Sequence, residues 1–156
     1  MNSAQDLQAL YRQTVLDHSR HPRNFLRLEP ADRVVVGHNP LCGDKLTLYL
    51  RLDNDRIENL TFEGTGCAIS MASASIMTES IKHHDLNDAQ REIDRIMQQF
   101  ESSHTGEEAV DAIVEGDMAA LGSVRAFPSR IKCATLAWKT LEAALQENTQ
   151  TATTEK

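Results

Sequence analysis

Three cysteines and one aspartate are the residues of this chain best suited to metal or sulfur chemistry. The cysteines are Cys42, Cys67 and Cys133, and the intervals between them are 25 and 66 residues. No local Cys-x-x-Cys pair is present, so spacing alone is only a weak indication of a metal site. An odd number of cysteines argues against a disulfide framework and favours metal binding or thiol chemistry.

Each cysteine lies at or beside a predicted turn. Cys42 falls in a loop rich in Asn, Pro and Gly, Cys67 follows a Gly-x-Gly sequence, and Cys133 falls in the first turn of a predicted helix. Because a helix N-terminus lowers the pKa of a thiol, we expect Cys67 and Cys133 to favour the thiolate. Gly43 permits a sharp reversal that can turn Asp44 to the same centre. Three thiolates and one carboxylate would suit tetrahedral zinc.

Other interpretations of these residues remain open at this point. Free cysteines are often small buried core residues, and an aspartate such as Asp44 often caps a loop. His38, four residues before Cys42, could serve as the base of a cysteine hydrolase, although the sequence shows no oxyanion loop or third orienting residue. We interpret the remaining candidate metal-binding histidines as surface residues: His83, His84 and His104.

An antiparallel meander is predicted around Cys42. Alternating leucines from Leu46 to Leu52 indicate a strand with one buried face. A β-branched run at Arg33–Val36, bounded by Gly37, predicts the preceding strand, and Ile57–Glu63 predicts the following one.

Helices are predicted before and after this meander in the sequence. Residues 3–21 carry an apolar face at helical spacing, formed by Leu7, Leu10, Tyr11, Val15 and His18. Further helices are expected over 68–76, 86–100, 105–114 and 116–122. A last long helix, with Ser129 as its N-cap, follows.

Composition and charge limit the class of protein. A chain of 156 residues with 40% hydrophobic and 25% charged residues is typical of one globular domain, which we place at 1–148, with a disordered tail at 149–156. The net charge of −7 argues against nucleic acid as a partner. No export signal or membrane-spanning run is apparent, so we expect a cytoplasmic protein without a membrane partner.

Three stretches of sequence resemble a known family. The stretches Asn39–Asp44, Gly64–Ser70 and Arg130–Trp138 resemble the three cysteine motifs of the SufU/IscU/NifU family of iron–sulfur cluster assembly proteins. The opening stretch Leu10–Phe25 also matches, so the resemblance covers roughly residues 7–146. It implies an α+β fold in which a three-stranded antiparallel sheet packs with several helices and carries a metal site at one end.

Within this family the chain resembles the SufU branch. The segment Leu86–Gly116, between the second and third cysteines, is longer than in IscU-type proteins. Lys132 stands where IscU-type proteins have histidine, and the Leu-Pro-Pro-Val-Lys chaperone motif of those proteins does not precede it. The resemblance implies zinc ligands at Cys42, Asp44, Cys67 and Cys133. It also implies that Cys42 accepts sulfur, with Arg130 supporting the anionic site.

The function implied by the resemblance is that of a zinc-dependent sulfurtransferase. Such a protein accepts persulfide sulfur from a PLP-dependent, SufS-like cysteine desulfurase and passes it to downstream cluster assembly proteins. The alternative within the family is a scaffold that holds a transient [2Fe–2S] cluster on the same thiolates. A structural zinc domain that only binds other proteins is an alternative from a different class.

Overall fold

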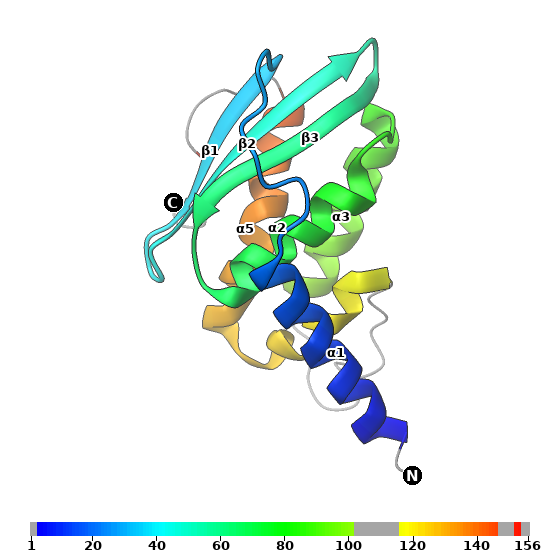
Figure 1. The fold of residues 1–156 in the computed structure, drawn as a ribbon, viewed down its shortest axis with the longest axis vertical. Coiled ribbons are helices and arrows are strands. Elements are labelled where there is room, and N and C mark those ends of the chain that lie inside the picture. The colour runs from blue at the N-terminus through cyan, green and yellow to red at the C-terminus, as the bar shows by residue number, and fades with distance from the viewer. Residues whose placement is uncertain (1–2, 102–115, 147–151, 154–156) are drawn as a thin grey trace.

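The computed structural model describes residues 3–101, 116–146 and 152–153. Strands β1 (Arg33–Asn39), β2 (Asp44–Asp53) and β3 (Arg56–Thr65) form an antiparallel meander. Figure 1 shows helices behind this sheet, and the α1–β1 connection crossing in front of it. The predicted α+β class with a three-stranded antiparallel sheet is therefore confirmed.

The register of the sheet follows from the alternation of leucines in β2. Leu48 pairs with Val35 of β1 and with Phe62 of β3, and all three side chains are buried. Leu46 and Leu50 point to the same face, because side chains two residues apart share a face of a strand. These residues form the sheet side of the hydrophobic core.

Gly37 lies inside β1, although it was expected to end that strand. The strand continues to Asn39, which pairs with Asp44 of β2. A Cβ atom at Gly37 would lie 1.9 Å from Thr140 Oγ1, so only glycine lets the last helix approach the sheet here. The physical role of Gly37 is thus close packing between distant segments, which a local turn signal cannot reveal.

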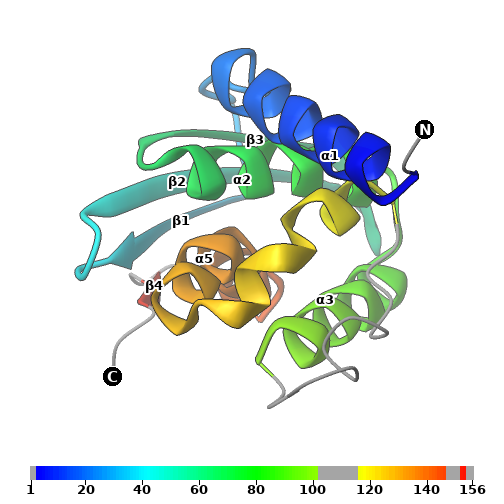
Figure 2. The same cartoon turned by 90° about the horizontal axis from the view of Figure 1, so that it is seen from below.

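Helices α2 (Ala68–Ile81) and α5 (Pro128–Leu145) pack against the sheet and against each other. Figure 2 shows α1 (Ser3–Arg20) over α2, and α3 (Leu86–Glu101) beside α5. A 3₁₀ helix, η1 (Gly116–Ala126), contacts α1 and α5, and it is longer than the predicted turn at 116–122. The helix predicted at 105–114 lies outside the described residues.

Apolar faces of the helices complete the core. In α3 the predicted stripe is confirmed, since Ile93, Ile96 and Phe100 are fully buried. The indole of Trp138 is also fully buried, and its Nε1–H donates to Ser73 Oγ over 3.2 Å. Ser73 Oγ donates in turn to the carbonyl oxygen of Ala134. This polar contact joins α2 to α5 within the core. No helix in the described part of the chain is long and apolar enough to cross a bilayer.

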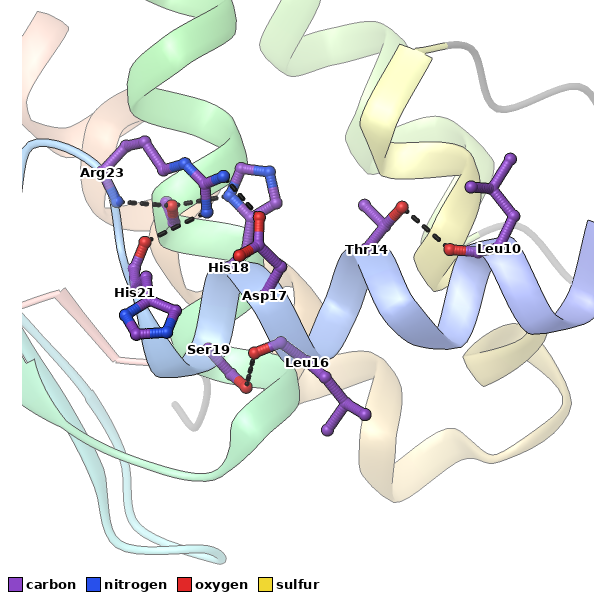
Figure 3. A network of polar contacts seen from close by, with 9 residues as sticks. Leu10, Thr14, Leu16, Asp17, His18, Ser19, His21 and Arg23 are labelled. Atoms are coloured by element: carbon purple, nitrogen blue, oxygen red, sulfur yellow. Dashed lines mark hydrogen bonds and ion pairs between the residues drawn. The ribbon is translucent and has the colours of Figure 1, made fainter.

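Polar contacts hold the C-terminal end of α1 against α2. His18 is buried, and its Nδ1 lies 2.7 Å from Ser75 Oγ, which also accepts a hydrogen bond from the backbone N–H of Arg23 (Figure 3). Arg23 pairs with Asp17, and this hydrogen bond lowers the pKa of the Asp17 carboxyl. Leu10 is 57% exposed, so its predicted place on the buried face was wrong.

One local prediction near the chain's C-terminal part needs correction. Helix α5 begins after an N-cap at Phe127, with no side-chain cap, because Pro128 occupies the first turn and its fixed φ suits that position; Ser129 is therefore not the cap. In the tail, Ala152–Thr153 forms a short strand, β4, parallel to β1. The outer edge of β1 offers unpaired backbone groups, which explains why two tail residues pair there.

Candidate metal centre

The β1–β2 turn presents Cys42 at one end of the sheet. The carbonyl oxygen of Asn39 accepts hydrogen bonds from Cys42 N over 3.3 Å and from Gly43 N over 2.9 Å, which closes the turn. Gly43 adopts a φ of +76°, the left-handed conformation that glycine tolerates best. Cys42 is exposed in this turn, whereas the next candidate ligand, Asp44, is fully buried at the start of β2.

Both carboxylate oxygens of Asp44 are held by hydrogen bonds. Oδ1 accepts from the backbone N–H of Cys67 over 2.9 Å, and Oδ2 accepts from Asn39 Nδ2 over 3.2 Å. A Cβ atom at Gly66 would lie 2.8 Å from Oδ1, so the segment before α2 can approach Asp44 only because residue 66 is glycine. The carboxylate is therefore oriented by its neighbours before any ligand binds.

The two other cysteines reach this position from separate helices. Cys67 is the N-cap of α2, where its Sγ accepts a hydrogen bond from Ser70 N over 3.5 Å. Cys133 lies in the second turn of α5, is fully buried, and its Sγ lies 3.5 Å from that of Cys42. The turn, α2 and α5 thus supply one cysteine each.

The structure brings together the ligand atoms of Cys42, Asp44 and Cys133, which all lie within 4.8 Å of one another. Cys67 lies outside this group of three, but it contacts Asp44 through its N–H, and its thiol interacts with that of Cys133. Thiolates with a single carboxylate are ligands that zinc accepts in tetrahedral sites, and thiolates are also the usual ligands of iron–sulfur clusters. The donor set therefore fits a thiophilic metal.

Electrostatics at Cys133 differ from the sequence-based expectation. Burial raises the pKa of the Cys133 thiol well above its ordinary value, and its contacts with Cys42, Cys67 and Asp44 raise it further. The expectation that a helix N-terminus would favour its thiolate was wrong, because Cys133 lies past the first turn, where desolvation outweighs the helix dipole. A divalent cation would supply the missing positive charge.

Arg130 and His38 do not join this group. Arg130 lies on α5, three residues before Cys133, with an exposed side chain, and within 3–101, 116–146 and 152–153 no hydrogen bond or ion pair links its guanidinium to these ligands. His38 lies between Gly37 and Asn39 in β1, so its side chain belongs to the opposite face of the sheet from that of Asn39. This placement disfavours a Cys42–His38 hydrolase pair.

Asn39 is a residue at this centre that sequence reasoning interpreted only as a turn former. It is fully buried and contacts both Asp44 and Cys133. A signal was present in its spacing, since Asn39 follows Val35 and Gly37 at intervals of two and so shares the buried face of β1. The early strand end assigned at Gly37 hid that signal.

Comparisons with known proteins agree with this geometry. The NifU-like N-terminal domain family matches residues 10–134. SufU of Bacillus subtilis, named a zinc-dependent sulfurtransferase, is 48% identical over 138 residues, which cover 88% of this chain and 90% of that protein. IscU of Streptococcus pyogenes serotype M1, named an iron–sulfur cluster assembly scaffold protein, is 35% identical over 142 residues, covering 91% and 86%.

A solved structure is similar in both fold and sequence. The crystal structure of FiSufU from Fervidobacterium islandicum AW-1 superposes with a TM-score of 0.75 at 34% identity, and the match covers 85% of this chain and 94% of that one. The residues matched by the family, 10–134, include Cys42, Cys67 and Cys133. The chain therefore belongs to the SufU/IscU/NifU family, whose shared unit is the NifU-like N-terminal domain.

Proposed function

We propose that this chain is a zinc-dependent sulfur carrier that accepts persulfide sulfur from a PLP-dependent cysteine desulfurase for iron–sulfur cluster assembly. Cys42, Asp44, Cys67 and Cys133 would hold the zinc ion. The observation that carries the proposal is the contrast in exposure within one ligand group: Cys42 is exposed, whereas Asp44 and Cys133 are fully buried. One ligand can therefore meet a partner while the others stay in place.

The sulfur-transfer step requires a thiolate on the exposed residue. Bound zinc would keep the thiols deprotonated at neutral pH. The Cys42 thiolate attacks the outer sulfur of the desulfurase persulfide, a new S–S bond forms on Cys42, and the desulfurase cysteine leaves as a thiolate. No external oxidant or reductant is needed, because the sulfane sulfur moves between two cysteines. Asp44 and Cys133 keep their places, since both are anchored in regular elements.

The local charge explains why a cation near this site would help. Three thiolates, one carboxylate and a divalent ion sum to about −2. We propose that the guanidinium of Arg130, exposed on α5 three residues before Cys133, offsets part of this negative charge when the partner docks and excludes water. Downstream cluster assembly proteins would then take the sulfur from Cys42.

A desulfurase assay on purified protein, together with metal analysis, tests the proposal. Wild type should contain zinc and accept sulfur, Cys42→Ala should remain folded and lose sulfur acceptance, and Asp44→Ala should lose zinc. Sulfur acceptance by Cys42→Ala would overturn the role of Cys42 as the acceptor, and failure of the wild type to accept sulfur would overturn the carrier function. If Cys42→Ala instead loses stability with no specific defect in acceptance, the site is a structural zinc domain.

The similarity to IscU scaffold proteins supports a second candidate, assembly of a [2Fe–2S] cluster on the same thiolates. Purification under anaerobic conditions separates the two candidates. A carrier should yield zinc and a persulfide on Cys42, whereas a scaffold should yield iron and labile sulfide.

A further inference from the structure

Asn39 places a buried primary amide directly behind the candidate ligands. It is the last residue of β1, opposite Asp44 in the ladder, and its side chain is fully buried. Burying an amide costs free energy unless hydrogen bonds replace those made with water. The acceptors that satisfy Asn39 therefore indicate why the residue is there.

Two of these acceptors are candidate metal ligands. Asn39 Nδ2 donates to Asp44 Oδ2 over 3.2 Å and to Cys133 Sγ over 3.7 Å. An amide nitrogen carries two hydrogens, so it can serve both acceptors at once. The backbone carbonyl of the same residue holds the turn that carries Cys42. One residue thus contacts three of the four candidate ligand residues.

The orientation of the amide follows from its neighbours. With the amide reversed, the Asn39 carbonyl oxygen would face a carboxylate oxygen and a sulfur atom, which repel it. Aspartate at this position would bring a second carboxylate against Asp44, and a cationic side chain would compete with a metal ion for the same ligands. A neutral donor avoids both effects.

We infer that Asn39 is a positioning residue of the metal centre, which orients the Asp44 carboxylate and the Cys133 sulfur towards a common ion. The inference rests on the metal site of the proposed function. Asp44 is then held from two sides, by Asn39 on Oδ2 and by the Cys67 N–H on Oδ1. Such outer contacts fix the direction of ligand lone pairs, and their loss typically weakens metal binding about 10- to 100-fold.

The test compares two variants that remove an amide donor without changing side-chain size. Asn39→Asp removes the donor at the centre. Asn24→Asp, the matched control, removes a donor to Thr78 Oγ1 at a partly buried site beside α2. Zinc affinity is measured by chelator competition, ligand geometry by the visible absorption of the Co²⁺-loaded protein, and folding by thermal unfolding of the metal-free protein.

Asn39→Ala removes the donor and adds no charge, so it should bind zinc about 10- to 100-fold more weakly and alter the Co²⁺ spectrum, while Asn24→Asp leaves both unchanged. Asn39→Asp also removes the donor, and an altered Co²⁺ spectrum in that variant serves as the test if the alanine variant does not fold. Wild-type affinity and spectrum in Asn39→Ala would overturn the inference. Failure of the wild type itself to bind zinc, or unchanged binding in Asp44→Ala, would overturn the proposed function instead.

Discussion

The backbone N–H of Cys67 donates a hydrogen bond of 2.9 Å to Asp44 Oδ1, and this contact ties the start of α2 to the start of β2. Two segments 23 residues apart in the chain thereby reach the same centre. The contact requires the backbone before α2 to come very close to a carboxylate. Position 66, which precedes Cys67, is therefore sensitive to any added side chain.

Gly66→Ala should weaken metal binding while the protein stays folded. The new Cβ would lie 2.8 Å from Asp44 Oδ1, so either the carboxylate or the segment before Cys67 must shift. Because outer contacts of this kind orient a ligand, we expect zinc affinity to fall about 10-fold or more. Chelator competition measures the loss. Gly122→Ala is the control, since among the described residues its Cβ would meet only Arg125 Nη2, at 3.9 Å. Equal affinities in the two variants would contradict this explanation.

Oxidation of the metal-free protein should link Cys42 to Cys133. Their sulfur atoms lie 3.5 Å apart, and a modest movement of the exposed turn closes this to the S–S bond length of about 2.05 Å. Treatment with diamide followed by peptide mass spectrometry should identify this pair, and zinc should protect against its formation. Cys67→Ser should still form the bridge. A predominant bridge to Cys67 in the wild type would contradict the observed geometry.

Alkylation of the metal-free protein should be slowest at Cys133. Burial raises the pKa of the Cys133 thiol. At pH values between the ordinary thiol pKa and this raised pKa, Cys133 of the native protein therefore stays protonated and is not nucleophilic. Iodoacetamide near pH 9 should therefore label exposed Cys42 first and Cys133 last. In guanidinium the difference should vanish, because the unfolded thiols are equally solvated. Equal native rates would show that burial does not control reactivity here.

Ser73→Ala should weaken the polar contact that joins α2 to α5, without removing a candidate ligand. The change deletes the bond to the Ala134 carbonyl and leaves Trp138 Nε1 without its acceptor in the core. An unsatisfied buried donor costs about 1–3 kcal/mol. Urea unfolding followed by fluorescence of Trp138, the single tryptophan, measures this cost. Ser80→Ala, on the exposed side of the same helix, should change stability by less than about 0.5 kcal/mol.

Local periodicity was sufficient to predict most elements of this fold. The alternating leucines of β2 and the Ile93, Ile96 and Phe100 stripe of α3 each repeat with the period of the element they form, so neighbouring residues alone identify them. The candidate ligands were predicted from motif resemblance, and the structure groups Cys42, Asp44 and Cys133.

The errors occurred where distant segments meet. Gly37 was predicted to end a strand. Glycine is needed there because any side chain would clash with Thr140, which lies about a hundred residues away in the chain. The burial of Cys133 depends on packing of α5 against other elements, which no local pattern records. Pairing of Ala152 with Gly37 depends on an available strand edge rather than on any property of the tail itself.

The strand pair β1–β4 has a practical consequence for anyone purifying this protein. Thr153 pairs with His38, four residues before Cys42, so whatever is fused just beyond β4 is tethered beside the candidate metal centre. A short tether gives its cargo a millimolar effective concentration. Polyhistidine at that end would offer imidazole to any metal ion bound by the candidate ligands and would distort measured affinities. A tag placed ahead of α1 begins at the far end of a long helix and avoids this interference (Figure 1).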